Sequence, residues 1–210
     1  MANFSTHIST AATAGVAFAG LGMALNLWPL GQIPAIVLLV TLGGIMPDID
    51  ADKSRSVRVI FTVLAVVAAF AGFGFARGMW PLPQVVALAL GLYVGVRDVV
   101  GFLFRMMTRH RASWHSLLAV AAITLSTVTI SFRCFGQPAR LAWSHGFAMG
   151  SGMMVHLILD ECFSIDLEGA RLKRSFGTAL KLFDYRRPVA TALMGGATLL
   201  LVPWLPAYSF

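Results

Sequence analysis

The sequence predicts an all-α membrane protein, a polytopic bundle of about seven transmembrane helices. Of the 210 residues, 58% are hydrophobic and only 12% are charged, whereas soluble domains carry about 25% charged residues. The apolar residues gather in seven blocks, and a hydrocarbon core of about 30 Å takes roughly 20 helical residues to cross. Lipid offers no hydrogen-bond partner to an open strand edge, and the sequence lacks the alternating polarity of a membrane barrel. The blocks are therefore expected to be helices.

The expected helices follow one another along the whole chain. The residues before the first block lack the basic stretch of a secretory signal, so this block is expected to be retained. The second block is short and contains Pro34, and Gly43 and Gly44 near its end permit a close helix approach. We expect residues 1–210 to form one membrane-embedded domain. Its helices lie near residues 10–28, 33–47, 57–76, 84–107, 115–133, 141–163 and 188–206.

One long polar segment, residues 164–187, separates the last two blocks. Its apolar residues recur at intervals of three to five, which fits an amphipathic stretch along the inner headgroup layer. A plain basic loop is the alternative. The apolar residues are Leu167, Leu172, Phe176, Leu180 and Phe183.

The basic residues predict the orientation, because short cytoplasmic loops are enriched in Lys and Arg. Arg97 lies inside the fourth block. Twelve others lie around the connections that follow the second, fourth and sixth blocks: Lys53, Arg55, Arg58, Arg105, Arg109, Arg111, Arg171, Lys173, Arg174, Lys181, Arg186 and Arg187. Three lie on the opposite side: Arg77, Arg133 and Arg140. We therefore expect a cytoplasmic N-terminus and an outer C-terminus.

The net charge of +7 is explained by this orientation and by attraction to anionic headgroups, so we expect no nucleic-acid partner. The oligomeric state is left open. Cys134 and Cys162 are expected a bilayer apart, which excludes a disulfide between them.

Histidines and aspartates from four distant segments are predicted to meet at the inner leaflet. Ionisable residues at membrane depth are costly and usually functional, so this convergence predicts a site. The first histidine is expected just before the first helix. The seven residues are His7, Asp48, Asp50, His110, His115, His156 and Asp160.

The spacing within two of these segments has a geometric consequence. His156 and Asp160 are four residues apart, so they share one face of a helix. His110 and His115 are five apart, about 140° around a continuous helix, and are expected to reach a common site from a bend.

Imidazole and carboxylate ligands without thiolate favour a divalent metal, zinc first and manganese or iron as alternatives. Seven candidates exceed the four ligands of a closed zinc site, which favours two ions, with one ion as the alternative. The alternatives without a metal are a hydrogen-bonded interfacial histidine, a helix cap at residues 47–50 and a basic loop at residues 109–116.

The remaining polar residues are placed outside the site. His145 lies nearer the outer leaflet. Arg97 and Asp98 are expected to pair with other helices or to line a channel, and Glu161 to be an interfacial carboxylate.

Four motifs together resemble the YdjM-like family of inner-membrane proteins: an early His7, LGGIMPDID at residues 42–50, HRASWHSLL at 110–118 and HLILDE at 156–161. This resemblance implies a bacterial inner-membrane location and a metal-dependent hydrolase. It assigns the ligand positions to His7, Asp48, Asp50, His110, His115, His156 and Asp160. Ala112 and Trp114 depart from the glycine and threonine usual in the family's loop motif, which leaves His110 less well supported than His115.

In such an enzyme, metal-activated water would be the nucleophile, with Asp50 or Asp160 as the carboxylate that accepts its proton. The expected substrate is a membrane lipid or lipid-linked phosphoester, with an amide or ester as the second choice. Lys53, Arg109 and Arg111 could hold its anionic headgroup. A metal transporter, or a regulatory membrane protein with a structural metal, is the non-enzymatic alternative.

Overall fold

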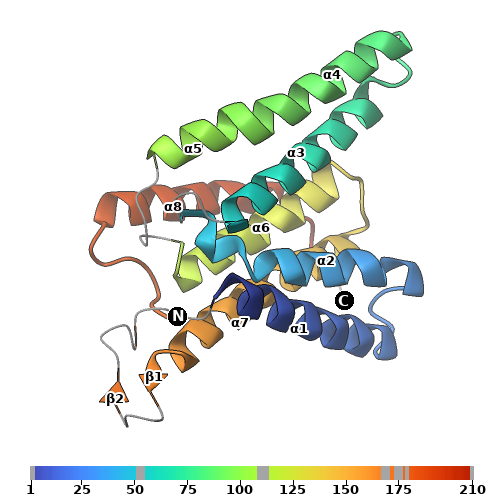
Figure 1. The fold of residues 1–210 in the computed structure, drawn as a ribbon. Helices are drawn as coiled ribbons and strands as arrows, with labels where there is room; N and C mark the ends of the chain where they lie inside the picture. The colour runs from blue at the N-terminus through green and yellow to red at the C-terminus, as the bar shows by residue number, and fades with distance from the viewer. Residues whose placement is uncertain are drawn as a thin grey trace. The chain divides into compact units, whose positions relative to one another are not determined.

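The computed structural model of the protein describes residues 3–50, 55–107, 114–166, 171–172, 177 and 180–208. Helices dominate this part of the chain (Figure 1). Contacts divide it into two compact units, Met1–Pro47 with Ala112–Phe210, and Asp48–Arg111. They are called unit 1 and unit 2 below, and each is described by itself.

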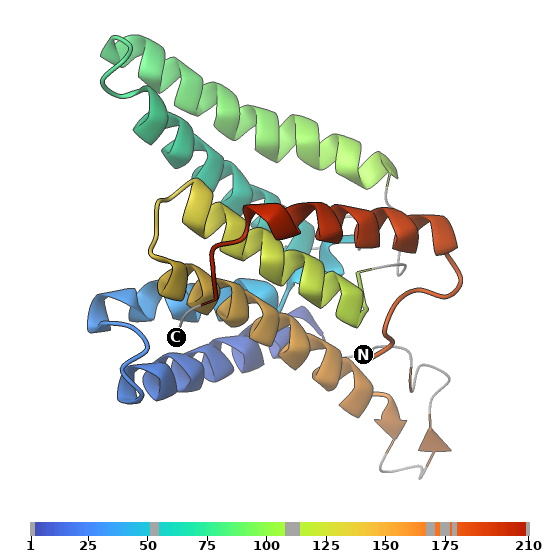
Figure 2. The same ribbon diagram turned by 180° about the vertical axis from the view of Figure 1, so that it is seen from behind.

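Unit 1 contains five long helices, which can be traced in Figures 1 and 2. Helix α1 packs on α2, both pack on α7, α7 packs on α6, and α6 packs on α8. Short 3₁₀ turns precede α2 and follow α8. The helices are α1 (Phe4–Ala24), α2 (Ile33–Gly43), α6 (Leu117–Arg133), α7 (Ala139–Cys162) and α8 (Pro188–Leu201).

Glycines bring α2 and α7 into close contact, as the glycine pair at the end of the second block predicted. A Cβ atom added to Gly43 would collide with the carbonyl oxygen of Met149, and one added to Gly152 would collide with that of Val40. Small residues at such a crossing let two helix backbones approach. The end of α2 is thereby held against the C-terminal half of α7, which carries His156.

Unit 2 contains a helical hairpin. Helix α3 (Arg55–Ala76) packs on α4 (Leu82–Val94), which continues through a π-helical turn (Gly95–Val100) into α5 (Gly101–Met107). Figure 1 shows α4 and α5 as one continuous rod. Large apolar side chains such as Phe70, Phe75 and Leu90 lie exposed on the hairpin. An apolar surface of this kind marks contact with a membrane or with another protein.

Two helical segments of the described chain are long and apolar enough to cross a membrane: Arg55–Ala76 and Leu82–Phe104. Their 22 and 23 residues span about 33 Å at 1.5 Å per residue, close to the roughly 30 Å of a hydrocarbon core. Three shorter apolar helices accompany them, at Leu30–Gly43, Leu117–Arg133 and Pro188–Trp204. The helical fold class is confirmed, whereas seven membrane spans remain a prediction.

Helices occupy all seven predicted blocks, with two local differences from expectation. The first helix begins at Phe4 instead of residue 10, because the Asn3 side chain accepts a hydrogen bond from the Thr6 amide and caps it. In the predicted amphipathic stretch, Ile165–Asp166 (β1) pairs antiparallel with Arg171–Leu172 (β2). Further along, Gly177 has a φ of 77°, which interrupts a right-handed helix.

Candidate metal centre

Four of the seven predicted ligands meet inside unit 1. His7 lies in the first turns of α1, His115 lies just before α6, and His156 and Asp160 lie one turn apart near the end of α7. Their exposed fractions are 2%, 7%, 0% and 2%, respectively. The prediction that His7 lies before the first helix was wrong. Helix α1 is capped by Asn3 and begins at Phe4, so His7 lies inside it.

Hydrogen bonds at the start of α6 fix the backbone next to His115. The Ser116 hydroxyl accepts the amide of Ala119 and caps α6, which fixes the residue directly after His115. The amides of Leu117 and Leu118 donate to the carbonyl oxygens of Lys181 and Leu182, both at 2.9 Å. The start of α6 is therefore held by the segment that leads to α8.

The carboxylate of Asp160 is the point on which the three imidazoles converge. The Nε2 atom of His7 lies 3.3 Å from Oδ1 of Asp160. The Nε2 atoms of His115 and His156 each lie 3.7 Å from Oδ2. Two ligands bound at about 2.0–2.2 Å to one tetrahedral zinc ion lie roughly 3.3–3.6 Å apart. Candidate ligand atoms of His7, His156 and Asp160 all lie within 4.8 Å of one another, which suits one shared divalent ion, and His115 lies next to this group.

A backbone hydrogen bond fixes the tautomer of His156. Its Nδ1 lies 2.7 Å from the carbonyl oxygen of Gly44, and a carbonyl only accepts, so Nδ1 carries the proton. In the neutral ring, the lone pair is then on Nε2, the nitrogen that faces Asp160. Metal-binding histidines are typically held in this way, by a backbone carbonyl on the nitrogen that does not bind.

Ring packing and charge also favour neutral imidazoles at this site. The rings of His7 and His156 stack with centroids 3.8 Å apart and an interplanar angle of 11°, and His115 meets His156 edge-on at 5.4 Å. Three protonated rings beside one carboxylate would leave a buried net positive charge, which is costly. The tautomer of His156 directs its Nε2 lone pair at Asp160, and a lone pair that faces a carboxylate favours a cation between them. The residues present therefore fit a divalent metal.

The cluster lies at one end of unit 1, where α1 and α6 begin and α2 and α7 end. At the opposite end, Arg133 donates to the Trp204 carbonyl and Arg140 donates to the Asn26 carbonyl. Cys134 and Cys162 are both free and lie at opposite ends of unit 1.

The remaining predicted site residues lie elsewhere or outside the described residues. Asp48 and Asp50 belong to unit 2, where the Ser56 hydroxyl donates to Oδ2 of Asp48 at 3.4 Å. Their role as ligands stays a prediction. Four further candidates lie outside the described residues: Lys53, Arg109, His110 and Arg111.

The polar residues that sequence analysis left aside have distinct surroundings. His145 is buried and shares a hydrogen bond of 2.7 Å with the Ser131 hydroxyl. Arg97 and Asp98 lie exposed on the π-helical turn of unit 2. Glu161 accepts a hydrogen bond from the amide of Gly177.

Two supports of the centre were missed from the sequence. The Gly44 carbonyl carries no sequence signal, because every residue has one. Asp184 is buried, pairs with Lys181 at 3.2 Å and accepts the Arg186 amide, which stabilises the turn before α8. Its position two residues before that amide is typical of an Asx turn, so this signal was present in the sequence.

These observations define a class: a helical protein with two membrane-span candidates and a buried cluster of metal-ligand type at one end of a helical unit. The model of the YdjM inner membrane protein family matches residues 1–172, so the chain belongs to that family. All four clustered residues fall within the matched range. No curated protein and no solved structure matches the chain.

Proposed function

We propose that the protein is a membrane-bound, metal-dependent hydrolase that acts at the cytoplasmic leaflet on a lipid or lipid-linked phosphoester. The observation that carries the proposal is the convergence of three imidazole Nε2 atoms on Asp160. The hydrogen bond from His156 to Gly44 adds the support that a ligand histidine needs.

The proposed cofactor is a divalent ion, zinc first and manganese or iron as alternatives, because the donors are nitrogen and oxygen without sulfur. His7, His115, His156 and Asp160 would hold it. A second ion would draw on Asp48, Asp50 and His110, all still predictions.

The chemistry of hydrolysis divides between the ion and the side chains. A bound divalent ion supplies Lewis acidity and lowers the pKa of a bound water. Asp160 is buried among the imidazoles and is the proposed proton acceptor, with Asp50 as the alternative. Lys53, Arg109 and Arg111 are proposed to bind the phosphate of the substrate as charge-assisted donors.

Charge bias supports the proposed orientation. Arg133 and Arg140 are two of the three basic residues assigned to the outer side, and both lie at the end of unit 1 opposite the cluster. The positive-inside rule then assigns the cluster to the cytoplasmic side. The full proposal is a multi-pass protein with about seven spans and an outer C-terminus.

A structural metal is the second candidate, and the burial of the cluster favours it. All four residues are buried, and four protein ligands can close a tetrahedral site, whereas catalytic zinc keeps one position open. In that case the ion would hold the starts of α1 and α6 against α7.

One set of measurements separates these functions. The full-length protein, purified in detergent, is analysed for bound metal and then placed in vesicles that contain phosphatidic acid. Release of inorganic phosphate and of fatty acid is measured before chelation, after chelation and after zinc, manganese or iron is restored. Unfolding temperature is recorded in the same three states, and His115→Ala is the matched variant.

A hydrolase predicts phosphate release that chelation abolishes and metal restores, with the helical fold retained. Fatty-acid release instead would identify an ester bond as the target. A large fall in unfolding temperature on chelation, without product at any stage, identifies a structural metal. Protein purified without metal, and unable to bind it when supplied, would overturn both candidates.

A further inference from the structure

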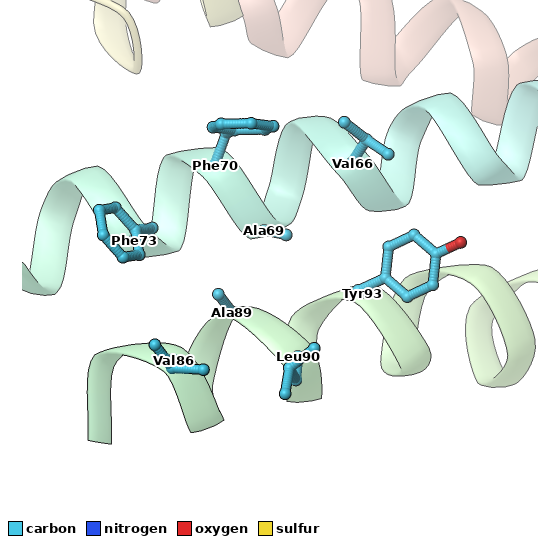
Figure 3. Close-up of a pocket in the computed structure, with 8 residues that line it drawn as sticks. All are labelled: Val66, Ala69, Phe70, Phe73, Val86, Ala89, Leu90 and Tyr93. Atoms are coloured by element: carbon cyan, nitrogen blue, oxygen red, sulfur yellow. The ribbon is translucent and has the colours of Figure 1, made fainter. Parts of the chain in front are cut away.

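An apolar groove runs between α3 and α4 of unit 2. Figure 3 shows Ala69 and Ala89 facing each other across it, with the Tyr93 ring at one end. Every other lining residue is apolar, Phe70 and Leu90 among them. The groove is open along one side and has a volume of about 330 Å³, at the lower end of the roughly 300–1,000 Å³ found for small-molecule sites.

The two helices that form this groove contain the two membrane-span candidates of the described chain. A groove between them opens onto lipid chains and not onto water if these helices span the bilayer. Its apolar lining suits an acyl chain, because no hydrogen-bonding group is needed along it.

A positive charge lies next to the Tyr93 end of the groove. The guanidinium carbon of Arg97 lies 5.8 Å from the centroid of the Tyr93 ring, and Arg97 is exposed on the π-helical turn. An arginine on a membrane-spanning helix is costly unless an anion or water meets it. Asp98 is adjacent in sequence but projects from a different side of the helix, and neighbouring residues do not face each other.

We propose that the α3–α4 groove binds one acyl chain of an anionic phospholipid whose phosphate pairs with Arg97. The planar guanidinium can bind two phosphate oxygens at once. Tyr93 lies between the two parts of the ligand, with its ring against the chain and its hydroxyl towards the headgroup. The lining of the site shares no residue with the histidine cluster, and lipid binding there does not depend on any hydrolytic activity.

The test is native mass spectrometry of the full-length protein in detergent, with phosphatidylglycerol or phosphatidylcholine of identical chains added at equal concentration. We expect several-fold more of the phosphatidylglycerol adduct. Arg97→Gln should remove this preference and leave both lipids equal. Arg77→Gln, which removes an exposed arginine from the turn between α3 and α4, is the matched control and should retain it.

A second variant tests the groove itself. Ala89→Phe fills the space opposite Ala69 and should lower binding of both lipids, while helix content measured by circular dichroism stays unchanged. Equal binding of the two lipids to the unmodified protein would contradict the proposal, as would a preference that survives Arg97→Gln. A dimer that Ala89→Phe dissociates would identify the groove as a helix-packing interface and would also overturn it.

Discussion

Two buried histidines on α7 have very different surroundings, although only about three helical turns separate them. His145 is 8% exposed and pairs through Nδ1 with the Ser131 hydroxyl. His156 is fully buried and pairs through Nδ1 with the Gly44 carbonyl. Both rings are therefore buried and both have a hydrogen-bond partner at Nδ1, so neither of these properties distinguishes a ligand from a packed histidine.

The difference lies at the second ring nitrogen. Nε2 of His156 faces Asp160, with His7 and His115 alongside. Among the described residues, the groups with metal-ligand spacing include His156 but not His145. A buried histidine therefore becomes a ligand candidate through the other donors that meet it, and His145 is the internal control for every experiment on His156.

The largest expected effect is loss of metal from the His156 end alone. His156→Ala removes one donor and should reduce the metal content of the purified protein from about one ion per chain to background. The loss should exceed the roughly 10- to 100-fold cost of removing an outer-shell partner. His145→Ala should leave metal content unchanged. Elemental analysis by inductively coupled plasma mass spectrometry measures both.

Metal content that stays at the level of the unmodified protein in both variants would contradict the assignment of the centre. Loss of metal from both variants would contradict the distinction between His156 and His145, because it would mean that metal loss follows general disruption of α7. Circular dichroism of each variant distinguishes disruption from specific loss.

The next largest effect is expected where α7 crosses α2. Gly152→Leu forces a side chain against the Val40 backbone and should lower the free energy of unfolding by roughly 3 kcal/mol. It should also weaken metal binding, because separation of the helices withdraws Gly44 from His156. Gly196→Leu on α8 meets no atom within 4 Å and is the control. Chemical denaturation in detergent gives the stability, and metal titration gives the affinity.

A stability loss without any change in metal affinity would show that His156 does not need the Gly44 hydrogen bond. In that case the hydrogen bond at Nδ1 of His156 would only support packing, as the one at Nδ1 of His145 does.

Periodicity and spacing predicted much of the fold and part of this site. The seven helical segments follow from long apolar blocks, since a block of such length has few alternatives in a membrane. The pairing of His156 with Asp160 follows from helical geometry, because residues four apart share a face. The convergence of His7 and His115 on that pair was predicted from the order of the helices, which puts all four residues at the same side of the membrane.

Other features were not contained in the apolar pattern. His7 lies inside α1 because a polar stretch continues the helix beyond its apolar block, and apolar patterning does not detect such residues. The Gly44 carbonyl is a backbone group, so its partnership with His156 follows only from the crossing of α2 and α7. The strand pair of β1 and β2 arises within a segment whose apolar spacing resembles that of a helix.

A smaller effect is expected at the His145 end. Ser131→Ala removes the hydroxyl that meets His145 Nδ1 and should cost about 1–3 kcal/mol in unfolding free energy, because a buried polar atom loses its partner. Metal content should not change. Ser126→Ala, at a partly buried serine on the same helix, is the control. A fall in metal affinity in Ser131→Ala would indicate that the two ends of α7 are coupled.

The smallest effect is expected at the cap of α1. Asn3→Ala removes the side-chain oxygen that accepts the Thr6 amide, and loss of an N-cap typically costs about 1 kcal/mol. Fraying of the first turns would loosen His7, so metal affinity should fall modestly while helix content changes little. Asn3→Asp keeps the acceptor and should restore affinity.

His145 is the control for these two variants. Because it lies on α7, its environment should not respond to either variant, and its ring signals in nuclear magnetic resonance spectra would show this. Unchanged metal affinity in Asn3→Ala would mean that His7 is held by its stacking on His156 and not by the start of its own helix.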